Sequence, residues 1–127
     1  MNNANSIPRE FKSIFARLRA ILQSQIGRLS VKEDSPTCFC LGGGVHSTQK
    51  KHMSVAWVEI GKAYVSYHLM PVYVHPELLD SFSAQLKARM QGKSCFNFKT
   101  ADEALFRELE RLTRKGFAAF KKDGYMP

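Results

Sequence analysis

Long apolar segments, acidic residues and cysteine are all scarce in this sequence. The longest uncharged stretches, residues 35–49 and 63–76, are shorter than the roughly 18 apolar residues that a membrane-spanning helix needs. The opening residues contain no apolar segment of the kind that a secretory signal requires. Only three cysteines are present, and without a signal they do not indicate a disulfide framework. We therefore expect a cytoplasmic protein without a membrane span.

The shortage of acidic residues leaves the chain strongly basic, with 19 Lys+Arg against 11 Asp+Glu and a net charge of +8. A basic domain is a candidate for nucleic-acid binding. However, residues 1–28 carry five bases and one acid, residues 81–100 four bases and no acid, and the chain from residue 101 six bases and five acids. No run of five like charges occurs. We therefore expect basic but solvated surfaces, and nucleic acid is not the expected partner.

The length and composition indicate one folded domain. A chain of 127 residues with 44% hydrophobic residues is the size of a typical single domain and has an ordinary globular composition. No internal repeat is visible. We predict a single domain over residues 1–127, with the first few residues disordered.

Two segments have the 3.6-residue apolar period of a helix with one buried face. The first covers residues 8–26 and the second residues 101–122. Thr100 and Glu103 form the pattern of a capping box at the start of the second helix, Gly116 is a position for a break or bend, and Gly124 ends it. The apolar positions of the two helices are Phe11, Ile14, Phe15, Leu18, Ile21, Leu22, Leu105, Phe106, Leu109, Leu112, Phe117 and Phe120.

Between these helices the period changes to two, which is typical of strands. Strands are predicted over residues 37–41, 52–60, 63–70 and 94–98, and Gly61 and Lys62 form a two-residue hairpin turn. Residues 42–51 read as a loop, a helical turn begins at Pro76, and a short helix covers residues 84–90. The fold class is therefore α+β, with a mainly antiparallel sheet of about four or more strands and long N- and C-terminal helices packed on one face.

The predicted hairpin sorts the side chains between two faces of the sheet. One face is apolar and belongs under the helices, with Ser54 opposite Leu69 at its far end. The second face pairs Glu59 with Tyr64, Trp57 with Ser66 and Val55 with His68, and adds Met70, Cys38, Cys40, Cys95 and Asn97. An antiparallel sheet often leaves one face to water, so a plain solvated face is one reading. These residue types are instead those of a lined cleft or partner surface, and both readings stay open.

Two segments resemble a known family. Residues 61–73, GKAYVSYHLMPVY, and residues 89–98, RMQGKSCFNF, are similar to the YdhG-like family of small bacterial domains of unknown function, which includes proteins labelled frataxin-like iron chaperones. The shared features are an aromatic-x-Met-Pro-x-aromatic segment after a strand and a later Gly-Lys-x-x-x-x-Phe strand that leads into a final helix. The similarity covers about residues 55–120. It implies a small α+β domain with a concave sheet.

Metal chemistry has one candidate set, which is Cys38, Cys40, His46 and His52. Two thiols at alternate positions of a strand share a face, and thiolate with imidazole suits zinc or iron. The spacing matches no common zinc module, and unreactive buried thiols are the competing interpretation. We expect no metal site and no cofactor.

The leading hypothesis is a non-enzymatic binding domain. It holds a small ligand or a protein partner on the second face, or closes a homodimer there, and basic residues at the rim favour an anionic group. A small enzyme that uses His68 and Cys95 is the alternative, and metal handling or nucleic-acid binding comes after it. No residue is assigned a catalytic role, and the expected ligand-binding residues are Trp57, Tyr64, Ser66, His68, Met70, Arg89, Lys93, Cys95 and Asn97.

Overall fold

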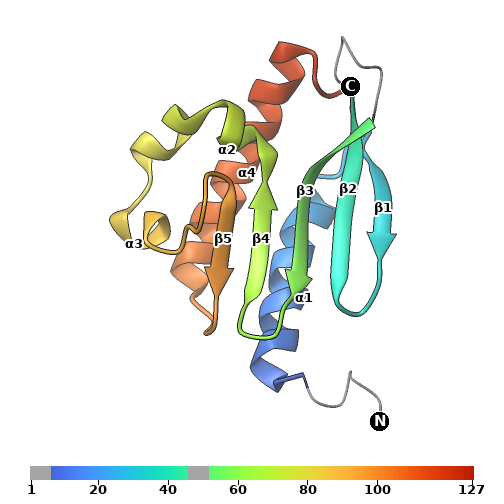
Figure 1. Ribbon diagram of the computed structural model, residues 1–127. Helices are drawn as coiled ribbons and strands as arrows, with labels where there is room; N and C mark the ends of the chain where they lie inside the picture. Colours follow the sequence, from blue (N-terminus) through green and yellow to red (C-terminus); the bar gives the residue numbers. More distant parts are fainter. Residues whose placement is uncertain (1–6, 46–51) are drawn as a thin grey trace.

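The computed structural model describes residues 7–45 and 52–127 and has an α+β fold (Figure 1). Five strands form one antiparallel sheet in the order β1-β2-β3-β4-β5, so each strand pairs with its neighbour in the sequence. This confirms the predicted fold class. The first six residues, for which disorder was predicted, lie outside the described residues. The elements are α1 (Arg9–Ser24), β1 (Ser30–Asp34), β2 (Cys38–Val45), β3 (His52–Ile60), β4 (Val65–Leu69), α2 (Met70–Val74), the 3-10 helix η2 (Pro76–Ser81), α3 (Ala84–Lys87), β5 (Cys95–Phe98) and α4 (Glu103–Asp123).

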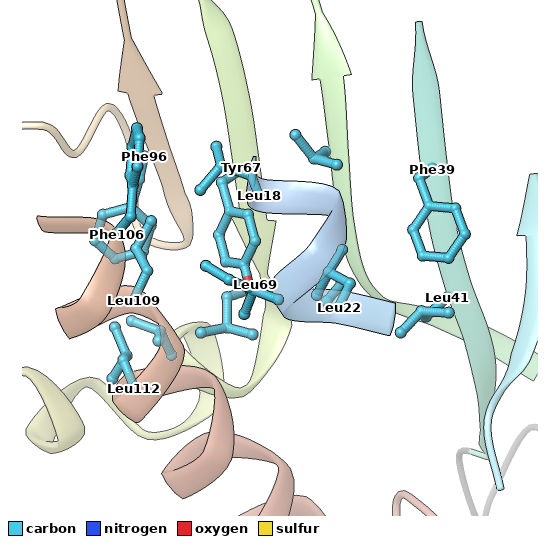
Figure 2. Close-up of a cluster of buried hydrophobic side chains, with 14 of the residues drawn as sticks. Leu18, Leu22, Phe39, Leu41, Tyr67, Leu69, Phe96, Phe106, Leu109 and Leu112 are labelled. Carbon is cyan, nitrogen blue, oxygen red and sulfur yellow. The ribbon is translucent and has the colours of Figure 1, made fainter. Parts of the chain in front are cut away.

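The long helices α1 and α4 lie side by side on one face of the sheet, as predicted (Figure 1). All twelve apolar residues predicted for their inner faces are buried. At the centre of the core, Tyr67 points from β4 toward the helices, and its hydroxyl makes a 2.5 Å hydrogen bond with the Thr113 hydroxyl of α4 (Figure 2). The Arg17 guanidinium donates hydrogen bonds to the Glu103 carboxylate from two nitrogens, at 2.7 and 3.0 Å. These bonds link the two helices at the surface. No helix in the described part of the chain is long and apolar enough to cross a membrane.

The ends and interior of α4 differ from the prediction. The helix begins at Glu103, and the Asp102 side chain caps it by accepting a hydrogen bond from the Leu105 amide, so the Thr100 capping box was wrong. Gly116 does not interrupt the helix. A Cβ at this position would lie 2.8 Å from the Pro71 Cβ, so glycine allows α4 to approach α2 closely. Gly124, in the left-handed conformation with φ of 85°, ends the helix as predicted.

The hairpin between β3 and β4 has a longer turn than predicted. The Gly61 amide donates to the Tyr64 carbonyl at 2.9 Å, so four residues make the connection and Gly61–Lys62 is not a two-residue turn. The register therefore moves by two residues, which places His68 opposite Trp57 and Ser66 opposite Glu59. Because side chains alternate with a period of two, an even shift leaves every side chain of β4 on its predicted face.

The sheet extends further at its β1–β2 edge than predicted. Strand β1 was not predicted, because all five of its residues are exposed and no alternation marks it. Strand β2 continues to Val45, so the glycines predicted to begin a loop belong to the strand. The pairing of β2 with β3 shifts between Leu41 and Gly42, and Val55 of β3 lies beside this irregularity. Val55 is consequently fully buried in the core, against the prediction that it lies on the second face.

The segment between β4 and β5 borders the sheet. Met70 begins α2 instead of ending the strand predicted over residues 63–70, and α3 stops at Lys87 instead of Met90. After α3 the chain runs antiparallel along the outer edge of β5. The Gln91 amide donates to the Cys95 carbonyl at 3.0 Å, and the Asn97 amide donates to the Arg89 carbonyl at 2.8 Å. Residues 89–91 therefore cover this edge of the sheet and form a wall beside its second face.

Candidate functional site

The second face of the sheet, opposite α1 and α4, presents two rows of side chains that each cross four strands. Paired residues lie on the same face, so the register of β2 to β5 defines the rows. Apart from Val55, Met70 and Ser54, this agrees with the predicted face. The first row is Cys40, Trp57, His68 and Cys95, and the second is Cys38, Glu59, Ser66 and Asn97.

The first row brings together a thiol, an imidazole and an indole. The rings of Trp57 and His68 stack with centroids 4.5 Å apart and planes 12° from parallel, and the Cys95 Sγ lies 3.7 Å from the His68 Nε2. Burial lowers the pKa of His68, although the Glu59 carboxylate opposes this. Burial also raises the pKa of Cys95, and the Ser66 hydroxyl opposes that rise. The imidazole and the thiol are therefore both held in their neutral forms at pH 7, which disfavours an activated nucleophile.

The second row is organised around the Asn97 amide. Its Oδ1 accepts hydrogen bonds from the Ser66 hydroxyl at 2.8 Å and the Cys95 thiol at 3.2 Å, and its Nδ2 donates to the Gln91 Oε1 at 2.7 Å. These bonds fix the orientation of both amides. The Gln91 Oε1 is occupied as an acceptor, so its NH₂ group remains as a donor. A hydrogen-bonded path thus leads from His68 through Cys95 and Asn97 to the wall of residues 89–91.

The other two cysteines, Cys38 and Cys40, belong to β2. Burial and the nearby carboxylates of Glu33 and Glu59 raise the pKa of Cys38 to about 12. The Cys40 Sγ is buried and lies 3.5 Å from the Ser54 hydroxyl, which places Ser54 on this face and not under the helices as predicted. Within residues 7–45 and 52–127, no three metal-ligating side chains cluster. Of the candidate metal ligands, His46 and the side chain of His52 lie outside the described residues.

A hollow opens where the second face meets the wall. It has a volume of about 400 Å³, at the lower end of the range for small-molecule sites. We call it the edge hollow, and its lining residues are Tyr64, Ala88, Arg89, Met90, Gln91, Asn97 and Lys99. No carboxylate is among them, and neither Arg89 nor Lys99 forms an ion pair with any described residue. Both side chains are exposed.

A second hollow of about 310 Å³ lies on the other side of Arg89 and shares Ala88 and Arg89 with the first. It contains Asp102, whose carboxylate caps α4. The edge hollow therefore has the more positive lining of the two.

The structure brings together most of the predicted site residues in two adjoining groups. Trp57, Ser66, His68, Cys95 and Asn97 share the two rows, and Tyr64 and Arg89 join Asn97 in the edge hollow. The other two residues lie apart. Met70 packs against the core from α2, and the Lys93 ammonium lies 5.8 Å from the centre of the Tyr73 ring.

Four residues of the hollow were missed by the sequence analysis, and two of them, Gln91 and Lys99, carry polar side-chain groups. Lys99 continues the alternation of Cys95 and Asn97, so extending the predicted strand by one residue would have found it. Gln91 has no such signal, because it reaches Asn97 only through the pairing of residues 89–91 with β5.

Comparisons with models of protein families, with curated proteins and with solved structures give no significant match. The resemblance to the YdhG-like family therefore stays a prediction.

Proposed function

We propose that this protein is a non-enzymatic binding domain that holds a small anionic ligand in the edge hollow. The observation that carries the proposal is the lining of the hollow, where the cations of Arg89 and Lys99 face no carboxylate. A guanidinium and an ammonium beside amide and phenol donors match the acceptors of a phosphate or carboxylate group. The Gln91 amide supports this, because the bond from Asn97 to its Oε1 fixes the amide's orientation and leaves its NH₂ group as a donor.

The aromatic row has a secondary role in this proposal. One ring face of Trp57 and one of His68 are covered by each other, so each ring offers at most one face to a ligand. Ser66 is buried and lies between this row and the hollow on the same face. A planar group on the ligand would extend from the hollow across Ser66 toward His68, while the anionic group supplies the larger part of the affinity.

Thermal shift and calorimetry with defined probes test the proposal. The probes are pyrophosphate, citrate and AMP, with adenosine as the uncharged counterpart of AMP. We expect the three anions to raise the melting temperature and adenosine to have little effect. Loss of a charged hydrogen bond costs about 1.5–3 kcal/mol, so Arg89→Gln and Lys99→Gln are expected to weaken binding roughly tenfold or more.

Lys12→Gln is the matched control, because Lys12 is an exposed base of α1 on the other side of the sheet. It removes the same charge without touching the hollow. Equal weakening by Lys12→Gln, or no shift with any of the three anions, would contradict the proposal.

One observation favours a second candidate, an enzyme that uses His68 and Cys95. The 3.7 Å separation of the Cys95 Sγ and the His68 Nε2 is close to the reach that a nucleophile and its base require. The raised thiol pKa and the lowered imidazole pKa oppose an ion pair between them, which is why a binding domain is the better-supported function.

A further inference from the structure

A second positively charged surface lies on α4. This helix covers one face of the sheet (Figure 1), whereas the edge hollow borders the other face. Residues 111–122 contain five bases and no acid. At 3.6 residues per turn, the five bases fall within about one third of the helix circumference. All five are exposed, while the buried residues of α4 point toward the core. We call this surface the α4 basic face, and it consists of Arg111, Arg114, Lys115, Lys121 and Lys122.

The charge of this face is not neutralised by neighbouring acids. The acids near the start of α4 have other partners: Glu103 and Glu110 lie beside Arg17, and Glu108 accepts hydrogen bonds from Ser83. Asp123, after the last base, is hydrogen-bonded to His75. None of the five bases makes an ion pair within the described part of the chain. The near-zero charge sum of residues 101–127 therefore conceals a segregated positive surface.

Two side chains of this face contact an aromatic ring, and two others line a hollow. The cations of Arg111 and Lys115 lie 5.4 and 5.6 Å from the centre of the Phe82 ring, which orients their side chains. On the side toward the end of α1, a hollow of about 310 Å³ is lined by Gln25, Arg114, Phe117, Ala118 and Lys121. Two cations and no carboxylate thus line a concave seat for an anionic group.

We propose that the α4 basic face binds the phosphate backbone of double-stranded nucleic acid without reading its sequence. The five bases extend over roughly 17 Å of a rigid helix, at a rise of 1.5 Å per residue. A small anion contacts one or two of them, whereas a polymer with a charge about every 1.7 Å of its axis contacts all of them. Contacts to phosphate oxygens carry no sequence information directly, so this mode of binding does not depend on the sequence of the duplex.

The character of the surrounding surface favours a duplex over other polyanions. Single strands bind where aromatic side chains stack on bases, and membranes bind helices with exposed apolar residues. Among the described residues, the exposed large hydrophobic side chains are Val31, Tyr73 and Val74, and none of them belongs to α1 or α4. The exposed surfaces of α1 and α4 therefore carry no large hydrophobic side chain that could stack on a base or insert into a membrane.

The test measures binding of a short fluorescein-labelled DNA duplex by fluorescence anisotropy over a series of salt concentrations. The variant is Arg114→Gln with Lys121→Gln, which removes both cations of the hollow. Its control is Arg9→Gln with Lys12→Gln, an exposed pair at the start of α1 that lowers the net charge equally. Circular dichroism checks that both variants stay folded.

We expect the wild type to bind the duplex with an affinity that falls steeply with salt. The Arg114/Lys121 variant is expected to bind more weakly and to reduce the slope of log K against log salt by about 2, since each lost phosphate contact removes about one unit. The control is expected to keep the wild-type slope. No binding at low salt, equal slopes for the two variants, or tighter binding to a single strand, to polyglutamate or to anionic vesicles would each overturn the proposal.

This surface is separate from the edge hollow, so the two proposals fail independently. Arg89→Gln and Lys99→Gln are expected to leave the salt slope of duplex binding unchanged, and the Arg114/Lys121 variant is expected to retain the pyrophosphate shift.

Discussion

His68 of β4 lies directly opposite Trp57 of β3, and their rings stack at a centroid distance of 4.5 Å. The contact links two half-buried side chains on a sheet face that no hydrophobic core covers. Aromatic pairs of this kind contribute about 0.5–1.5 kcal/mol beyond the area that they bury. A double-mutant cycle with Trp57→Ala and His68→Ala, measured by urea unfolding, is expected to give a coupling free energy in that range. Additive losses would show that the rings do not stabilise each other.

His68 is expected to make the protein less stable in acid. Burial lowers its pKa below 6.5, so between the folded pKa and 6.5 the unfolded chain holds a proton that the folded chain does not. The free energy of unfolding therefore falls as the pH drops from 6.5 through the folded pKa. NMR titration of the imidazole, assigned with His68→Gln, measures the pKa directly. A midpoint at or above 6.5 would contradict this prediction.

His75 is expected to have the opposite effect on the pH dependence of stability, because it stabilises the fold in acid. Its imidazole makes hydrogen bonds with Asp123, at the end of α4, and with Glu77, and these bonds raise its pKa. A raised pKa stabilises the fold fully below pH 6.5, and that stabilisation is lost as the pH rises through the folded pKa. His75→Gln is therefore expected to cost more free energy of unfolding at about pH 5.5 than at about pH 8.5. An equal cost at both pH values would show that the protonated form has no special role.

Cys95 is expected to react slowly with iodoacetamide at neutral pH, because burial raises its pKa and the thiolate is the reactive form. Cys38, with a pKa of about 12, is expected to be slow as well. Mass spectrometry of digested samples measures the rate at each site, with free cysteine as the reference. Alkylation of Cys95 faster than free cysteine, and lost in His68→Gln, would instead support the enzyme hypothesis.

The hydrogen bond between Tyr67 and Thr113 is expected to affect stability mainly because removing one hydroxyl leaves the other buried without a hydrogen-bond partner. Both side chains are fully buried, so Tyr67→Phe leaves the Thr113 hydroxyl without a hydrogen-bond partner. This is expected to lower the free energy of unfolding by about 1–3 kcal/mol. Thr113→Val leaves the Tyr67 hydroxyl without a hydrogen-bond partner and is expected to have a similar cost. The double variant is expected to lose clearly less than the sum of the two in urea unfolding. A fully additive result would mean that the two hydroxyls do not depend on each other.

The two long helices and, apart from Val55 and Ser54, both faces of the sheet could be predicted, because apolar periodicity determines them. The turn at Gly61 could not, since its length depends on whether the Gly61 amide bonds to Tyr64. The face assignment survived this error only because the shift in register was even. Strand β1 escaped prediction because it is exposed along its whole length, so its pairing with β2 leaves no apolar alternation in the sequence.

The candidate site was predictable only in part, for a related reason. Trp57, His68 and Cys95 follow from alternation along three strands, whereas the edge hollow exists because residues 89–91 return along β5. Such a backbone pairing leaves no periodic mark in the sequence. The α4 basic face was hidden differently, because a charge sum over a segment does not distinguish bases that face water from acids that are already paired.

The consecutive strand order of the sheet has a consequence for how the chain folds. Each pair of adjacent strands from β1 to β4 is consecutive in the sequence, so these strands can pair after the closure of short loops. Only the addition of β5, after the segment that contains α2, η2 and α3, requires a longer closure within the sheet. Because the edge hollow needs both β5 and residues 89–91, it is expected to form late in folding and to open first in native-state hydrogen exchange, well before the amides of β3 lose protection.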